Sequence, residues 1–151
     1  DLVTFFDVLN QIQFSKQGAV ITRVASILSD NGFIVLREPA LELCGGRHDR
    51  EVGIQKRYDR TIMRTLLESA GLTVVYQSYI NFFLCPLICL TRKIGLLFND
   101  SPRSDVVETG AMLNTLLLTV LRIEKRLLRR ITFPFGVSLV AIAQKRQKGT
   151  P

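Results

Sequence analysis

The stretch LSDNGFIVLREPA, Leu28 to Ala40, decides the fold that this sequence predicts. It begins at the end of a helix and passes through a tight Asn31-Gly32 turn. A buried strand is expected from Phe33 to Leu36, followed by a loop that begins at Glu38. In an open α/β sheet, such a strand leads to the edge at which ligands bind.

The residues before this stretch complete a strand-helix-strand unit. Leu2 to Phe6 is a continuous apolar run that is too short for a helix, so it predicts a strand buried on both faces. Ser15 to Leu28 predicts a helix, with Ser15 as its cap and Gly32 as its stop. The unit therefore indicates a right-handed crossover between two parallel strands. The apolar residues that recur at helical spacing are Ala19, Val20, Val24, Ile27 and Leu28.

The residues after the stretch continue the alternation of strands and helices. Pro39 to Arg57 is a polar, glycine-bearing loop beyond the end of a strand, which is where chemistry is expected. Asp59 caps a helix that ends at Gly71, and Leu72 to Tyr76 forms the next strand. The helix positions expected to face the core are Ile62, Met63, Leu66, Leu67 and Ala70.

Two helices and a last strand are expected in the rest of the chain. Asn81 to Phe98 is apolar, and a longer helix runs from about Thr109 to Arg130. The longer helix is expected to pack an apolar stripe on the sheet while its basic face stays in water. Val137 to Ala143 alternates as the last strand. The stripe is Leu113, Leu116, Leu117, Val120 and Leu127, and the basic residues are Arg122, Lys125, Arg126 and Arg129.

The composition indicates one globular domain, since 47% of the 151 residues are hydrophobic and 22% are charged. The net charge of +7 favours anionic partners, but the chain lacks the interleaved aromatic positions and the helix-turn-helix spacing of nucleic-acid modules. We therefore expect no nucleic acid. Three irregularly spaced cysteines and one histidine predict a reduced, cytoplasmic chain without a bound metal. The chain does not begin with Met and shows no signal peptide, so we expect it to be part of a longer protein.

Five strings, in order, resemble the C-terminal part of a class I S-adenosylmethionine-dependent methyltransferase of the type 11/12 kind. DLVTFFDVLNQI at 1–12 is similar to that family's fourth strand and the turn after it, although Asn10 and Gln11 stand where relatives often carry EH. The Asn31-Gly32 turn resembles the turn before the fifth strand, and REPA at 37–40 is similar to the end of that strand. HD at 48–49 and GIQKRYDRTIMRTLLESAGL at 53–72 resemble a subgroup pattern.

The resemblance implies an α/β fold with a partial Rossmann-like methyltransferase sheet, strands four to seven, and helices on its faces. Residues 1–151 would form a single partial methyltransferase domain with a helical insertion at about 80–131. In that family a glycine-rich loop after the first strand wraps the cofactor, but this chain contains no G-x-G. The family's first strand lies beside the fourth, so Asp1 to Phe6 would keep an unpaired apolar edge. We expect a partner segment to complete the sheet.

The resemblance also implies S-adenosylmethionine as cofactor, with Phe5, Phe6, Asp7 and Leu9 at the positions that contact its methionine end. The alternative for the two phenylalanines is a plain core role. Asp7 either accepts a hydrogen bond from the ammonium group of the cofactor or caps the turn.

The loop supplies the other candidate residues. His48 is the candidate catalytic base, because an imidazole titrates near neutral pH and can remove a proton from the acceptor as it attacks the methyl group. A structural or exposed loop histidine is the alternative. Lys56, Arg57 and Tyr58 are candidates for binding an anionic substrate; the alternative is a solvated loop that anchors Tyr58 in the core.

The function that the sequence predicts is methyl transfer from S-adenosylmethionine to a small or lipid-like acceptor, as part of a longer enzyme. The alternative is a non-catalytic interaction domain that binds a partner or an anionic membrane through the basic helix at Arg122 to Arg130. The expected location is cytoplasmic, with peripheral membrane contact as an option. Liposome binding and cofactor binding separate these two functions.

Overall fold

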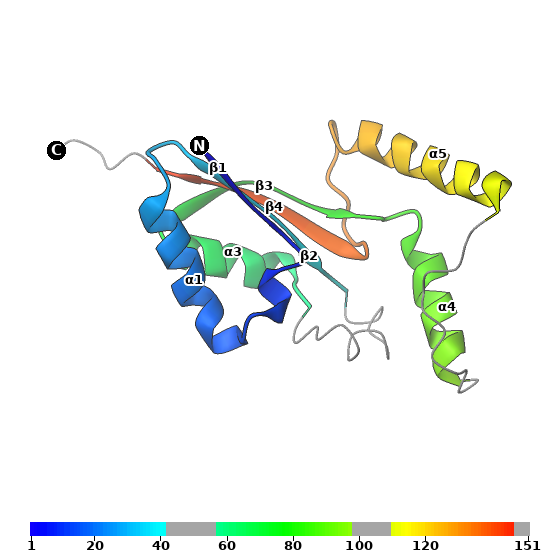
Figure 1. Ribbon diagram of the computed structural model, residues 1–151. Coiled ribbons are helices and arrows are strands. Elements are labelled where there is room, and N and C mark those ends of the chain that lie inside the picture. Colours follow the sequence, from blue (N-terminus) through cyan, green and yellow to red (C-terminus); the bar gives the residue numbers. More distant parts are fainter. Residues whose placement is uncertain (42–56, 98–109, 147–151) are drawn as a thin grey trace.

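The computed structural model describes residues 1–41, 57–97 and 110–146 of the chain (Figure 1). The first part holds strand β1, the 3-10 helix η1, helix α1 and strand β2; the later parts hold α3, β3, α4, α5 and β4. This order confirms the predicted α/β class. In chain order the bounds are β1 Leu2–Phe6, η1 Leu9–Gln11, α1 Phe14–Ile27, β2 Phe33–Pro39, α3 Arg60–Ser69, β3 Leu72–Ile80, α4 Cys85–Leu97, α5 Ala111–Leu127 and β4 Ser138–Lys145.

The four strands form one mixed sheet in the order β1-β2-β4-β3. β1 and β2 are parallel, with Leu2 opposite Phe33 and Phe6 opposite Arg37, which confirms the predicted parallel pair. β4 lies between β2 and β3 and runs antiparallel to both of them. The sheet is therefore not purely parallel, because the last strand enters it from the opposite end.

Strands β2 and β3 extend further at their carboxyl-terminal ends than their apolar runs predict. β2 continues past Leu36 to Pro39, and β3 continues past Tyr76 to Ile80. Both extensions pair with the first residues of β4, so backbone hydrogen bonding carries the strands beyond their apolar segments. As a result Glu38, which was expected in a loop, lies within β2.

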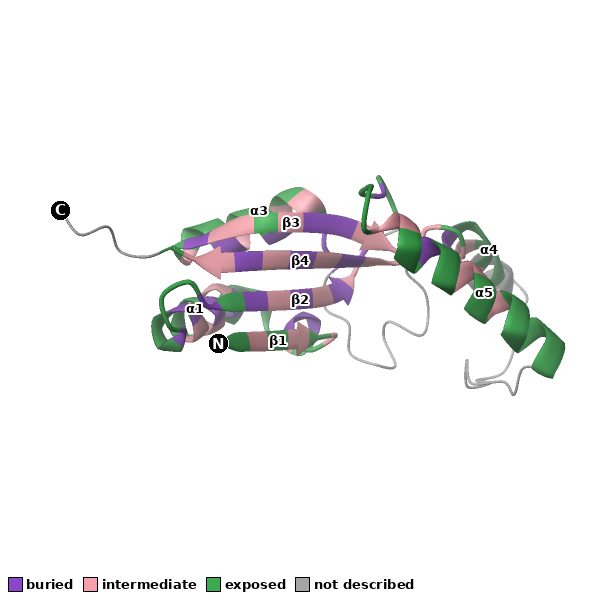
Figure 2. Ribbon diagram, turned by 90° about the horizontal axis from the view of Figure 1, so that it is seen from above, coloured by how far each residue is buried: buried purple, intermediate pink, exposed green. Residues whose placement is uncertain are grey.

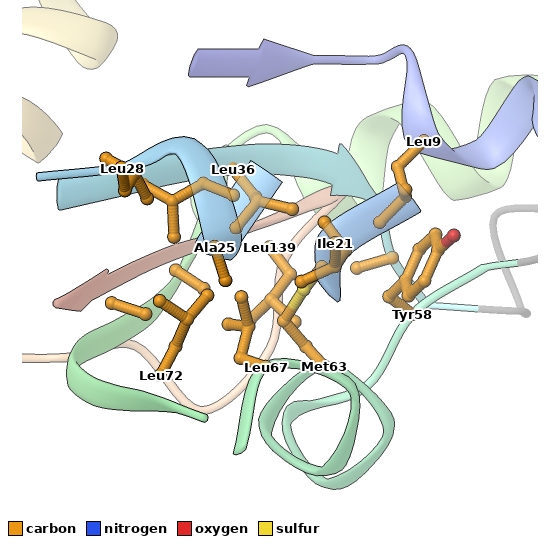
Figure 3. Close-up of a cluster of buried hydrophobic side chains, with 14 residues drawn as sticks. Leu9, Ile21, Ala25, Leu28, Leu36, Tyr58, Met63, Leu67, Leu72 and Leu139 are labelled. Atoms are coloured by element: carbon orange, nitrogen blue, oxygen red, sulfur yellow. The ribbon is translucent and has the colours of Figure 1, made fainter. Parts of the chain in front are cut away.

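The core lies between the sheet and two helices on one of its faces. α1 and α3 lie side by side under the sheet in Figure 1, and Figure 3 shows their side chains meeting those of the strands. The predicted core face of α3 is confirmed, because Met63 and Leu67 are fully buried and Asp59 caps the helix. The buried core residues include Leu9, Ile21, Ala25, Leu28, Ile34, Leu36, Tyr58, Met63, Leu67, Leu72 and Leu139.

The predicted start and core face of α1 are partly wrong. Helix α1 begins at Phe14, and no side chain caps it, so Ser15 is not its cap. Ile21 and Ala25 form the buried row, whereas Ile27 remains 64% exposed. The apolar spacing alone permits either face, and packing against α3 selects the row that contains Ile21.

The prediction that β1 is buried on both faces is wrong for the structure as described. Val3 and Phe5 pack against the core, but Leu2 is 60% exposed and Phe6 is 54% exposed. The reason is that α1 and α3 both cover the same face (Figure 1), and no described helix lies over the Leu2 and Phe6 side of the strand. The expectation of helices on both faces therefore holds for one face only among the described residues.

The predicted packing of α5 on the sheet is also wrong. Leu113 and Leu116 of the expected stripe lie exposed, and α4 and α5 extend beyond the end of the sheet (Figures 1 and 2). The buried residue of α5 is Glu124, whose carboxylate accepts hydrogen bonds from the amides of Asn81 and Phe83. This polar anchor fixes the rotation of α5, so Leu113 and Leu116 remain exposed while Leu117, Val120 and Leu127 are half-buried. None of the described helices combines the length and the apolar character needed to cross a membrane.

The cap of α3 gives a first testable prediction. The side chain of Asp59 accepts a hydrogen bond of 2.7 Å from the amide of Ile62. We expect Asp59→Ala to lower the free energy of unfolding by about 1 kcal/mol, because an amide at the helix start loses its acceptor. Chemical denaturation measures the change. Asp30→Ala removes an exposed turn carboxylate and is the control; an equal effect of both substitutions would contradict the capping role.

The outer edge of β1 gives a second prediction. β1 pairs only with β2 among the described strands, and its exposed apolar residues make it a template for another strand. We expect the purified chain to self-associate and Thr4→Lys to reduce this, measured by light scattering. Thr22→Lys on α1 adds the same charge away from the edge and should change nothing. A wild-type chain that stays monomeric and melts cooperatively would argue against an adhesive edge.

Candidate functional site

The carboxyl ends of β1 and β2 lie side by side and form the candidate site. β1 ends at Phe6, which is opposite Arg37, and the chain then turns through Asp7 into η1. β2 continues past Arg37 to Glu38. Parallel strands of open α/β sheets present their ligand-binding residues at this end.

A buried carboxylate joins the two strand ends. The side chain of Glu38 is fully buried and accepts hydrogen bonds from the amides of Leu9 and Asn10 at 2.9 and 3.0 Å. The side-chain amide of Asn10 donates a third bond, at 2.8 Å. The first amides of a helix have no partner within the helix, so Glu38 satisfies those of η1 and fixes η1 against β2.

Burial sets the protonation behaviour of Glu38. Desolvation raises the pKa of this carboxyl, and the negative charge of Asp7 adds to the rise. The hydrogen bonds from Asn10 and Leu9 favour the ionised form and lower the pKa, but burial outweighs them. The site therefore contains a carboxyl group that holds its proton more tightly than an exposed glutamate.

The turn after β1 places a half-exposed ion pair beside an aromatic ring. Asp7 adopts a positive φ of 55°, a conformation that Asp tolerates better than most residues. Its amide donates to the Arg37 carbonyl at 2.8 Å, and its carboxylate pairs with the Arg37 guanidinium. That guanidinium lies 5.7 Å from the ring centroid of Phe6. Phe6, Asp7 and Arg37 thus share one accessible surface at the end of the sheet.

A second layer of buried polar groups supports this turn. The side-chain amide of Gln17 donates to the carbonyls of Leu9 and Ile12, each at 2.9 Å. Tyr58 is buried next to this layer, and the pKa of its hydroxyl is raised by burial and by the charge of Glu38. The side-chain oxygens of Asn10 and Gln17 have no hydrogen-bond partner of normal geometry in the structure as described. The layer is therefore polar but closed to solvent.

The predicted cofactor contacts are divided between the surface and the core. Phe6 and Asp7 meet at the exposed surface, Phe5 is half-buried, and Leu9 is fully buried at one end of the core (Figure 3). Sequence reasoning missed Arg37 and Glu38 as site residues. The signal that could have found them is the polar pair RE inside the REPA string, directly after an apolar strand.

The predicted loop residues are only partly described. Arg57 and Tyr58 are both buried, and the guanidinium of Arg57 donates to the Ala40 carbonyl at 2.7 Å. Tyr58 lies in the core, as the alternative interpretation of this segment expects (Figure 3). His48 and Lys56 lie outside the described residues. The structure therefore joins Arg57 to the end of β2 but does not place the candidate base.

No group of metal-binding side chains is found within residues 1–41, 57–97 and 110–146. Cys85 and Cys89 share a face of α4, with their sulfur atoms 3.8 Å apart. Burial raises the pKa of the Cys85 thiol.

Several solved structures have a fold similar to that of this chain. No family model and no curated protein sequence matches the chain. A S-adenosylmethionine-dependent methyltransferase from Archaeoglobus fulgidus is similar over 96% of this chain, with a TM-score of 0.53 and 13% identity. The chain shares the fold of methyltransferases. It spans 59% of the Archaeoglobus protein.

Two further structures show the range of proteins with this fold. One is from the complex between the Haloferax volcanii Trm112 methyltransferase activator and a protein assigned as a methyltransferase. The similarity covers 100% of this chain and 56% of the length of the Haloferax chain, with a TM-score of 0.54 and 16% identity. The other is the [4+2]-cyclase SpnF, with a TM-score of 0.51 and 12% identity. The similarity covers 97% of this chain and 49% of the length of SpnF. The methyltransferase fold therefore also occurs in a cyclase, so it does not fix the reaction.

The buried carboxylate gives a third prediction. In Glu38→Gln an NH₂ group would face the Asn10 donors, so at least one buried hydrogen bond would be lost. We expect the free energy of unfolding to fall by about 2 kcal/mol at neutral pH, measured by equilibrium denaturation. Glu68→Gln, on the exposed side of α3, is the matched control and should have a small effect.

The difference in the free energy of unfolding between wild type and Glu38→Gln depends on pH, because the pKa of Glu38 is raised in the folded chain. The folded chain keeps a proton on Glu38 that the unfolded chain releases above the ordinary pKa of 4.5. The stability from this proton is therefore fully present below pH 4.5 and is lost as the pH rises through the folded-state pKa. We expect the stability difference between wild type and Glu38→Gln to shrink with rising pH in that window. A difference that grows with pH would show that the hydrogen bonds outweigh burial.

Proposed function

We propose that this chain acts in methyl transfer from S-adenosylmethionine to a small or lipid-like acceptor, as part of a longer enzyme of the class I, type 11/12 kind. The observation that supports this most is the likeness in fold to the Archaeoglobus methyltransferase over 96% of the chain. The position of the Phe6, Asp7 and Arg37 surface at the carboxyl ends of two parallel strands adds to it. In this proposal residues 1–151 are one partial domain with an insertion at about 80–131.

The exposed residues of the turn fit one end of the cofactor. S-Adenosylmethionine supplies a methyl group bound to a sulfonium and carries an ammonium group at its methionine end. The Asp7 carboxylate can accept from that ammonium, and the half-exposed ring of Phe6 presents an aromatic face to a cation. Arg37 already pairs with Asp7, so it would share this carboxylate with the ligand or bind the methionine carboxylate. Phe5 and Leu9 would support the turn from the core side.

In this proposal, the parts of the cofactor beyond its methionine end are bound by a further segment. The chain contains no G-x-G with which to approach the ribose closely. The free edge of β1 can receive a parallel strand, and such a strand would place its following loop beside Asp7. The Haloferax structure is a complex with an activator, which supports a partner as one source of such a segment.

The acceptor side of the reaction is assigned to the loop before α3. His48 would act as the base that removes a proton from the attacking atom. Lys56 would attract an anionic acceptor, while Arg57 and Tyr58 hold the end of the loop against β2. The bond of Arg57 to the Ala40 carbonyl supports this anchoring role.

Calorimetry with S-adenosylhomocysteine on the full-length product of the gene tests the proposal. We expect binding, and we expect Asp7→Asn to weaken it about tenfold, because the ammonium would lose a charged acceptor. Asn tolerates the positive φ of this position, so the turn should persist. Asp30→Asn is the control and should bind as wild type. Absence of binding by a folded wild-type protein would overturn the proposal.

A second candidate is a non-catalytic interaction domain that uses the basic helix. The exposure of Met112, Leu116 and Ile123 on α5 favours this candidate, since a helix that only supports an enzyme would bury such large apolar side chains. Vesicle binding without any cofactor binding by the full-length protein would support it. Cofactor binding together with methyl transfer would exclude it.

A further inference from the structure

The arm formed by α4 and α5, residues 81–97 and 110–134, carries most of the net charge of the chain. These segments contain seven of the 20 basic residues and one of the 13 acidic residues. The acidic residue is Glu124, which is buried against the amides of Asn81 and Phe83. Within the described segments 81–97 and 110–134, therefore, no exposed carboxylate accompanies the basic residues.

An apolar row runs along the exposed side of α5. Met112, Leu116 and Ile123 are 90%, 60% and 47% exposed. Their spacing of four and seven residues, one turn and then two turns, places them on one side of the helix, with the exposed Thr119 between Leu116 and Ile123. A row of large apolar side chains in water on one helix side is a contact surface and not a core face.

A basic row lies next to the apolar row on the same exposed side. Arg126 follows Ile123 by three residues, so the two side chains are neighbours on the helix surface. Arg122 and Arg129 extend the basic row one turn in each direction, and all three arginines are exposed. The exposed side of α5 is therefore amphipathic, with the apolar row and the cationic row side by side on the helix surface.

We propose that α5 docks on an anionic lipid surface, with the Met112, Leu116 and Ile123 row entering the interface and the arginines binding headgroup phosphates. Charge complementarity favours this occupant, because each exposed cation near an anionic leaflet adds to binding. α5 has no aromatic residue for stacking on bases, which disfavours single-stranded nucleic acid. The centres of protein interfaces are poor in charge, which disfavours a second copy of the chain on the mixed rows. No described helix is fit to span a bilayer, so the contact is peripheral.

Docking in this way would bring one end of the sheet close to the lipid. β1, β2 and β3 all point toward the end at which α4 and α5 lie (Figure 2). The site around Glu38 lies at the same end. The proposal is independent of methyl transfer, because lipid binding by α5 requires neither cofactor nor acceptor.

Co-sedimentation of the chain with vesicles tests this surface. One set of vesicles is phosphatidylcholine alone, and the other contains phosphatidylserine as well. We expect binding to the anionic set only, reduced by added salt. Arg122→Gln with Arg126→Gln should weaken binding about twentyfold, and Leu116→Ser with Ile123→Ser at least about tenfold.

The control variants change the same residue types elsewhere. Lys16→Gln with Arg23→Gln removes two exposed cations of α1, and Ile27→Ser removes an exposed apolar side chain of that helix. These variants should bind as wild type, and circular dichroism checks that every variant is folded. Equal binding to neutral vesicles, or no effect of the α5 variants, overturns the proposal. It is also overturned if the chain ignores vesicles and the Leu116→Ser, Ile123→Ser variant instead abolishes a dimer or binding to DNA.

Discussion

The carboxylate of Glu38 holds together the candidate site at the carboxyl ends of β1 and β2. It lies at the end of β2, yet its three hydrogen-bond donors belong to Leu9 and Asn10, which follow β1. Without this bridge, the first amides of η1 would be buried without partners at the point where the chain leaves the sheet. The turn at Asp7 and its ion pair with Arg37 are positioned by the same bridge, because η1 fixes the far end of the turn.

Two surfaces of the chain are left without a partner for different physical reasons. The edge of β1 is open because hydrogen bonding in a sheet needs a second strand, and the described chain provides one only on the β2 side. The row of Met112, Leu116 and Ile123 on α5 is exposed because the buried Glu124 sets the rotation of the helix. The edge of β1 can pair with another strand, whose backbone groups would hydrogen bond in register. The exposed side of α5 can bind a broad surface that accepts apolar and cationic side chains together.

The fold of this chain does not by itself identify a reaction. The sheet is shared with an archaeal methyltransferase and with a cyclase, both at low identity. The fold therefore does not assign a function, which must be argued from the side chains at the carboxyl ends of the strands. At that end the structure contributes a half-exposed Asp7 and Arg37 pair, the ring of Phe6 and a buried carboxyl group. These groups can hold and orient a charged ligand, which is the role proposed for them.

The sequence by itself determined the type and order of most elements, although not the start of α1 or the ends of β2 and β3, and part of the site followed from it. The apolar run at Leu2 to Phe6, the Asp59 cap and the Gly71 stop each fix their element through neighbouring residues, and Phe6 and Asp7 were predicted at the site. Only the tertiary structure decided that Leu9 lies in the core, that Glu38 bonds to η1, and that Leu113 and Leu116 of α5 are exposed. Glu38 and Asn10 are 28 residues apart, and Glu124 and Asn81 are 43 apart. Contacts over such separations depend on how strands pair and helices rotate, and local spacing carries no information about either.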